Sequence, residues 1–320
     1  MAIEIDRISP ITVLLDDVFY QSSIQDMRSA YFQFLKHYAK WIIVSDYYLE
    51  NEKANKVITF TVLPLAGDVI QLQNVIRRFA PQDFKHIKVV DPRFIELLQE
   101  LPLMTISFVL PQDKYLVWSD SKEFREYLAD FCETLIAYIA FWRKSTSNQV
   151  RLDKLLKNVE YAQRLLQQKK KIKLLCETFL IALLGGYVGS IICRETALTD
   201  LCWLSDRDKT NEVGNNLIRD LFQVTLIDII KKNILFSFTT ANSHSDEWYA
   251  DLTRVPDIIT GSIAAFNFDN ASGRMWKPTA QTVIGSYLLN NRDSCFIYRF
   301  HVSEEMLKVQ RLMVAYNHQA

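Results

Sequence analysis

The chain has 320 residues, of which 49% are hydrophobic and 23% are charged, and its formal net charge is +0. This composition excludes a disordered or fibrous chain and is typical of a globular protein with a sizeable core. Lys and Arg together number 37, as do Asp and Glu, so any polynucleotide partner would have to bind a local basic patch. The five cysteines are scattered and form no CxxC pair, which predicts buried thiols in a reducing cytoplasm.

The amino-terminal part of the chain alternates between helical and strand-like patterns. The expected elements are a helix at 22–40, strands at 41–45 and 57–63, a helix at 69–78 capped by Asp68, a strand at 104–110 and a short partner strand at 115–118. The first two strands are rich in β-branched residues and flank a polar, turn-like stretch, so they predict a hairpin.

Long helices dominate the middle of the chain, and strands return after them. The expected elements are helices at 121–143, 150–168 and 170–193, a strand at 201–204, a helix at 215–231, a strand at 234–239, a helix at 257–266, a helix near 278–290, a strand at 295–300 and a final helix from Ser303. The strand–helix–strand unit at 200–240 predicts a right-handed parallel crossover. Together these elements predict an α/β fold with helices packed on a mixed sheet.

One segment, at 178–193, is as apolar as a membrane span. It falls short of the ~20 residues that cross a bilayer, and Glu177 and Arg194 flank it. Its three glycines favour close packing, so we expect a buried helix and no membrane association. The first residues lack the basic-then-apolar order of a secretory signal, which also favours a cytoplasmic location.

Four aspartates lie at positions where a metal site could form. Asp46 ends the run 41–46, Asp206 and Asp208 end the run 201–208, and Asp257 lies at the start of a helical stretch. Carboxylates at strand ends and at a helix start can converge on one crevice. Carboxylate oxygens are ligands that Mg²⁺ and Mn²⁺ prefer, and a pair of such ions can hydrolyse phosphodiesters.

Simpler interpretations stay open for each carboxylate. An Asp after a strand is often a turn former or a cap, and an Asp near a helix start favours the helix dipole. Other acidic residues are alternative candidates for the metal site: Asp16 and Asp17 after a rival strand at 11–15, Asp91 and Glu96 near a helix start, and Asp246, Glu247 and Asp251 in an acidic stretch before Asp257. Candidates for binding phosphate are the basic runs Arg77–Arg78 and Lys169–Lys173. A lysine run is more often a solvated face than a phosphate site.

The runs around the later aspartates carry a family resemblance. The segments 203–208, 215–216, 236–240 and 251–261 contain, in order, Trp-Leu-Ser-Asp-Arg-Asp, Asn-Asn, Phe-Ser-Phe-Thr-Thr and Asp-Leu-Thr-Arg-Val-Pro-Asp-Ile-Ile-Thr-Gly. This order resembles an uncharacterised bacterial family with a ribonuclease H-like fold. Members of that family end in a Pro/Ala-Asp-Leu-(Ile/Val)-Ala-Gly-Ala helix and usually begin with a strand ending in Asp-Glu-Ser or Asp-Asp-Ser.

The resemblance implies specific residues and chemistry. It implies that Asp46, Asp206 and Asp257 are catalytic metal ligands, with Asp208 as an additional ligand, and that the metal is Mg²⁺ or Mn²⁺. The family pattern also includes a helix-borne glutamate, for which Glu123 and Glu133 are the candidates.

The expected organisation is an amino-terminal helical extension at 1–40, a ribonuclease H-like core at 41–267 and an α/β extension at 268–320. The core would contain a helical insertion at about 121–195. We expect a metal-dependent nuclease acting on DNA or RNA. The alternative is an inactive binding or scaffold protein on the same fold, whose many aromatic residues could meet a protein partner or a second copy of the chain.

Overall fold

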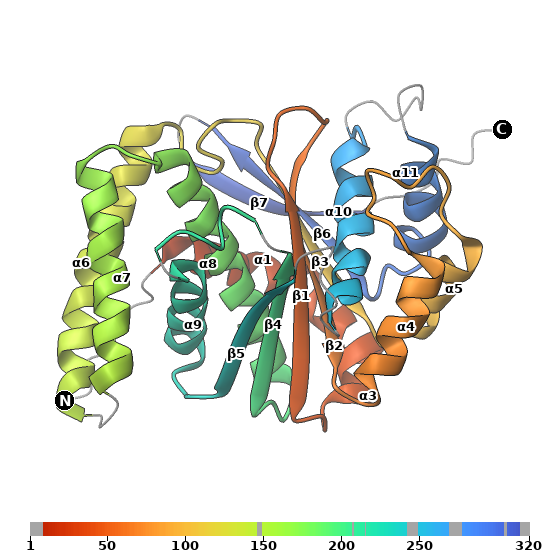
Figure 1. Ribbon diagram of the computed structural model, residues 1–320, viewed down its shortest axis with the longest axis horizontal. Coiled ribbons are helices and arrows are strands. Elements are labelled where there is room, and N and C mark those ends of the chain that lie inside the picture. Colours follow the sequence, from red (N-terminus) through yellow and green to blue (C-terminus); the bar gives the residue numbers. More distant parts are fainter. Residues whose placement is uncertain are drawn as a thin grey trace.

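A seven-stranded mixed sheet runs through the centre of the molecule, with helices on both faces (Figure 1). The computed structural model describes residues 9–145, 149–206, 208–214, 216–241, 249–268, 277–303 and 306–313. The strands are β1 (Lys40–Tyr48), β2 (Lys56–Pro64), β3 (Met104–Leu110), β4 (Asp200–Asp206), β5 (Leu235–Ala241), β6 (Cys295–Val302) and β7 (Leu307–Leu312). The predicted α/β architecture with a mixed sheet is confirmed.

The strand order is β5-β4-β1-β2-β3-β6-β7. The chain makes an antiparallel meander through β1, β2 and β3, which confirms the predicted hairpin. On the other side, β4 pairs in parallel with β1, and β5 pairs in parallel with β4. Because β1, β4 and β5 run in the same direction, their carboxyl ends lie at one edge of the sheet.

One face of the sheet is covered by α1 (Pro10–Ser22), α8 (Ile172–Glu195) and α9 (Leu217–Ile230), with α6 (Ser121–Ser145) and α7 (Gln149–Gln167) outside them (Figure 1). Helix α8 lies close against α9, since a Cβ at Gly186 would come within 2.7 Å of the Phe222 carbonyl oxygen. Among the described residues, α8 is the one helix long and apolar enough to cross a membrane, and its apolar window is wholly buried. The predicted buried helix is therefore confirmed.

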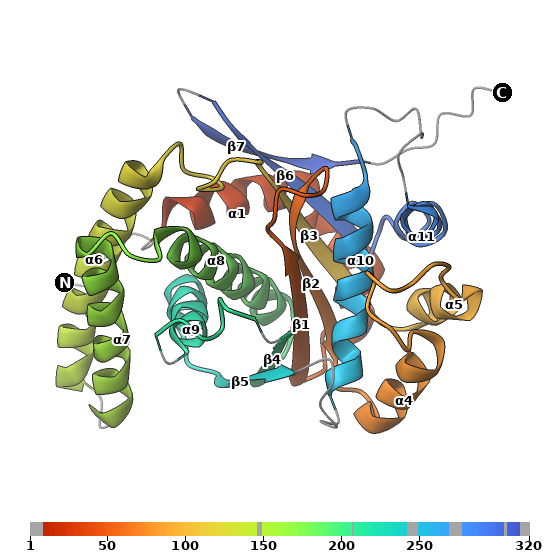
Figure 2. The same cartoon turned by 45° about the horizontal axis from the view of Figure 1, so that its top comes forward.

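The other face is covered by α4 (Val69–Phe79), α5 (Pro92–Glu100), α10 (Arg254–Ala265) and α11 (Pro278–Val283), which continues as η3 (Ile284–Leu288). Helix α10 crosses the middle of the sheet and lies against β1 and β2 (Figure 2). A short 3-10 turn, η2 (Ala250–Thr253), leads into it. Asp68 caps α4 as predicted, because its carboxylate accepts the backbone N–H of Ile70 at 2.8 Å.

The amino-terminal helical region differs in part from its prediction. The rival strand at 11–15 is wrong: Pro10 begins α1, and Ile11, Leu15 and Phe19 bury one side of that helix. The helix predicted at 22–40 is confirmed over 24–35, where α2 (Ile24–Asp26), the π-helical segment η1 (Met27–Phe32) and α3 (Gln33–Leu35) follow one another without a break. Ser23 has a non-helical backbone that separates α1 from this helix, and its N–H donates to the Phe19 carbonyl at 2.9 Å.

Two further predictions are wrong. The final helix expected from Ser303 is strand β7, which pairs antiparallel with β6. The free edge of β6 offers backbone partners that a helix would leave unused, so tertiary pairing overrides the ambiguous apolar spacing. The strand expected at 115–118 is a turn, with Leu116 in the left-handed region at φ 59°.

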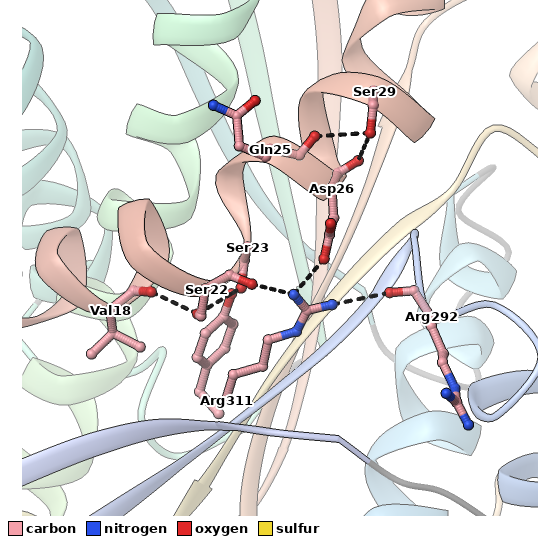
Figure 3. Close-up of polar contacts among 9 residues, drawn as sticks. Val18, Ser22, Ser23, Gln25, Asp26, Ser29, Arg292 and Arg311 are labelled. Atoms are coloured by element: carbon pink, nitrogen blue, oxygen red, sulfur yellow. Dashed lines mark hydrogen bonds and ion pairs between the residues drawn. The ribbon is translucent and has the colours of Figure 1, made fainter.

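Arg311 ties the carboxyl-terminal hairpin to the amino-terminal helices (Figure 3). From β7 its guanidinium donates to the Ser22 carbonyl at the end of α1, to Asp26 Oδ2 at 2.5 Å and to the Arg292 carbonyl at 3.4 Å. The tail at 277–313 therefore belongs to the same sheet and core as the rest of the chain.

Candidate functional site

Asp46 and Asp206 lie side by side on the face of the sheet that α10 covers. The parallel register of β1 and β4 pairs Ser45 with Ser205, so the two aspartates occupy the next position on each strand. Side chains alternate along a strand. Val44 and Leu204 belong to the core beneath α10, and Asp46 and Asp206, two residues further on, point to that same face.

Asp257 joins this pair from the first turn of α10. Its Oδ2 accepts the backbone N–H of Phe84 at 2.7 Å, and a carboxylate in the first helical turn also interacts favourably with the helix dipole. Burial raises the pKa of Asp46 well above its usual value, and the charges of Asp257 and Asp206 raise it further. The structure thus brings together three of the four predicted carboxylates.

The negative charges of these carboxylates repel one another. Burial raises the pKa of Asp257, and Asp206 adds to the shift, while the Phe84 N–H and Arg254 act in the opposite direction. Half-buried carboxylates with few compensating donors favour the protonated form. Within the cluster of Asp46, Asp206 and Asp257 (the carboxylate cluster), burial and the neighbouring negative charges therefore both raise the pKa of Asp46 and of Asp257.

Two lysines and two aromatic rings lie next to the carboxylate cluster. The Lys53 amine lies 3.9 Å from the Tyr48 ring centroid and 5.1 Å from that of Phe84. The Lys277 amine lies 4.3 Å from the Phe84 centroid and donates to the Phe84 carbonyl at 2.6 Å. Burial lowers the pKa of Lys53, and the charges of Asp257 and Asp46 oppose that shift.

Asp208 lies apart from the cluster. Strand β4 ends at Asp206, and the chain then turns, so that the Asp208 carboxylate accepts the N–H and the hydroxyl of Thr210, each at 2.5 Å. The oxygen of the same Thr210 hydroxyl lies 3.1 Å from the Tyr47 hydroxyl oxygen. Tyr47 follows Asp46 directly and so points to the opposite face of the sheet. The structure therefore assigns Asp208 to a local turn.

The two candidates for the helix-borne glutamate, Glu123 and Glu133, both lie on α6. Glu123 accepts the N–H and hydroxyl of Ser119 at 2.6 and 2.5 Å at the start of α6, and Glu133 is exposed on α6. Glu177, in the second turn of α8, is buried near Asp208, and burial raises its pKa. In the sequence Glu177 flanks an apolar segment, and no neighbouring residue indicates that it belongs to a polar cluster.

The rival acidic residues have structural partners. Asp16 accepts from Tyr187 at 2.9 Å and from Arg194 at 2.8 Å. Asp91 caps α5 by accepting the Arg93 N–H at 2.9 Å. Asp251 accepts from Gln73 and Arg77, whereas Asp246 and Glu247 lie outside the described residues.

The carboxylate cluster does not form a complete three-ligand metal centre. Within the part of the chain that the structure describes, no three His, Cys, Asp or Glu side chains could hold one ion together. A cavity of 580 Å³ between α6, α7 and α9 lies on the other face of the sheet and includes none of these residues. No protein-family model, curated protein or solved structure matches this chain.

Proposed function

We propose that this protein is a metal-dependent nuclease of the ribonuclease H-like class. The observation that carries the proposal is the carboxylate cluster: Asp46, Asp206 and Asp257 come from β1, β4 and α10 and influence one another's pKa on one face of the sheet. Charge repulsion between carboxylates costs folding free energy, and such frustrated groups are typical of functional sites.

The strand order supports the same class. Strands β1 to β3 form an antiparallel meander, and β4 and β5 add in parallel on the far side of β1. In the proposed class, α6–α8 correspond to the helical insertion and β6–β7 to the carboxyl-terminal extension. Fold alone does not define chemistry, so the proposal depends on the carboxylates.

The donor set fits a hard divalent cation. Mg²⁺ commonly binds proteins through one or two carboxylates and completes its shell with water and phosphate oxygens. Asp46 and Asp206 on neighbouring strands could supply two such ligands, and Asp257 the third negative charge. A bound cation would supply charge that activates water and stabilises the leaving oxygen.

The test is cleavage of labelled DNA and RNA with Mn²⁺ or Mg²⁺ by the wild-type protein and by a variant carrying Asp206→Asn and Asp257→Asn. We expect the wild type to cleave and the double variant to lose at least about 100-fold in rate, since removal of charge-stabilising groups typically costs this much. Asp208→Asn is the matched control, because Asp208 lies in the turn on the other side. Equal cleavage by the wild type and the double variant would contradict the proposal.

A second candidate function is a binding or scaffold protein on the same fold. Asp257 already accepts the Phe84 N–H, and no complete three-ligand centre exists within the described residues. Calorimetric titration with Mn²⁺ separates the two functions. Heat that disappears in Asp206→Asn supports the nuclease, whereas the absence of any binding that depends on Asp206 supports the scaffold.

A further inference from the structure

Lys53 and Lys277 come from distant parts of the sequence and lie beside the same ring. Lys53 belongs to the turn between β1 and β2, and Lys277 directly precedes α11. Their amines lie 5.1 and 4.3 Å from the Phe84 centroid. Residue 84 itself lies in the connection between α4 and α5, so three separate segments meet here.

Phe84 holds these cations in a fixed relation to the carboxylate cluster. Its N–H binds Asp257 at 2.7 Å, and its carbonyl accepts from Lys277 at 2.6 Å. Its ring is buried against α10, where Gly261 leaves no room for a Cβ. One residue therefore connects a carboxylate, a lysine amine and the helix that carries the carboxylate.

Neither lysine forms a direct ion pair with the carboxylates. Within the described residues, no carboxylate oxygen lies within 4 Å of the Lys53 or Lys277 amine, although other lysines such as Lys231 have such partners. Both amines are only partly buried. Each therefore retains donor capacity for an incoming anion, because an ammonium group has three donors.

We propose that Lys53 and Lys277 form a phosphate-binding pair that holds a backbone phosphate of a polynucleotide next to the carboxylate cluster. This inference rests on the proposed nuclease function and adds to it a positioning role for two residues. The lysines offset the repulsion that the three carboxylates would exert on an anionic strand. They act on binding and placement of the strand, whereas the carboxylates act on hydrolysis.

The experiment measures binding, so that it does not depend on cleavage. Fluorescence anisotropy of a short fluorescein-labelled single-stranded DNA, in EDTA, gives Kd as a function of salt for the wild type, Lys53→Gln, Lys277→Gln and Lys53→Arg. Each lost phosphate contact should lower the slope of log K against log salt by about 0.7. We expect that decrease in both Gln variants and a wild-type slope in Lys53→Arg, which keeps the charge.

Lys85→Gln is the matched control. Lys85 follows Phe84 directly, is exposed and lies 3.8 Å from Asp83, so its removal changes the local charge without changing the pair over the ring. An equal fall in slope for Lys85→Gln, or an unchanged slope for both Gln variants, would overturn the inference. The same series with single-stranded RNA shows which backbone is bound more tightly. Failure of cleavage with intact lysine-dependent binding would instead count against the nuclease alone.

Discussion

Replacing Gly261 by Ala should destabilise the protein, although Ala is ordinarily the better helix former. Gly261 lies in α10 one turn after Asp257. A Cβ at this position would lie 2.2 Å from Phe84 Cδ1 and 2.4 Å from Cγ. Carbon atoms in contact are normally about 3.5–4.0 Å apart, so the Phe84 ring would have to move by more than about 1 Å.

The expected change in the free energy of unfolding is the difference between two opposing contributions. Gly to Ala inside a helix gains roughly 0.5–1 kcal/mol from backbone entropy. Overpacking of a filled core typically costs about 1–3 kcal/mol, and Phe84, which is 3% exposed, has little space into which to move. We expect a net loss of about 1 kcal/mol in the free energy of unfolding, measured by urea denaturation followed by circular dichroism.

A double-mutant cycle identifies the cause. With Phe84 truncated to Ala, the clash disappears, and Gly261→Ala should stabilise that background by roughly 0.5–1 kcal/mol. Gly67→Ala is the control substitution, because its Cβ would have no neighbour within 4 Å. Stabilisation of the otherwise wild-type protein by Gly261→Ala would refute this account of the packing.

Two further stability predictions concern the carboxylate cluster and the tail. The pKa of Asp46 is raised by burial, Asp257 and Asp206, so its contribution to stability is fully present below the unfolded pKa near 3.8 and is lost as the pH rises through the folded pKa. The thermal unfolding midpoint of Asp46→Asn should therefore be higher than that of the wild type near pH 8 in EDTA, and this difference should shrink towards pH 4. A lower midpoint for the variant at pH 8 would count against this. Arg311→Met leaves the Ser22 and Arg292 carbonyls without their donor and should cost about 1–3 kcal/mol in chemical denaturation, with an unchanged midpoint as the contradicting result.

Local patterns were sufficient for most of the sheet. Strands β1 and β2 are continuous runs with β-branched residues, and the turn between them is polar, so their hairpin could be predicted without tertiary information. The buried position of α8 was predicted from the glycines of its apolar run, which suit close packing, although the whole helix of 24 residues is longer than the run 178–193 on which the length argument rested. Asp46, Asp206 and Asp257 could be nominated because each lies near the end of a recognisable element.

Other features of the candidate site could not be predicted, because they depend on contacts between segments that are distant in the sequence. Asp208 would share a face with Asp206 only if the strand continued, but Thr210 offers the Asp208 carboxylate two donors and the chain turns. Lys53 was not predicted, because a lysine in a polar turn has no distinguishing sequence pattern. Its amine lies 5.1 Å from the Phe84 ring centroid, a contact between segments that are distant in the sequence.

The location of the site follows from the topology more than from the individual residues. The chain leaves β1 towards β2 on one side and leaves β4 through α9 towards β5 on the other. The two connections diverge at the carboxyl ends of β1 and β4, and in open sheets with parallel strands ligands bind at such points. Asp46 and Asp206 are the residues that these strands place there, and α10 crosses above them with Asp257. A chain of zero net charge can therefore concentrate three carboxylates and two lysines in one place, and the raised pKa values of Asp46 and Asp257 mark this place as the site to test.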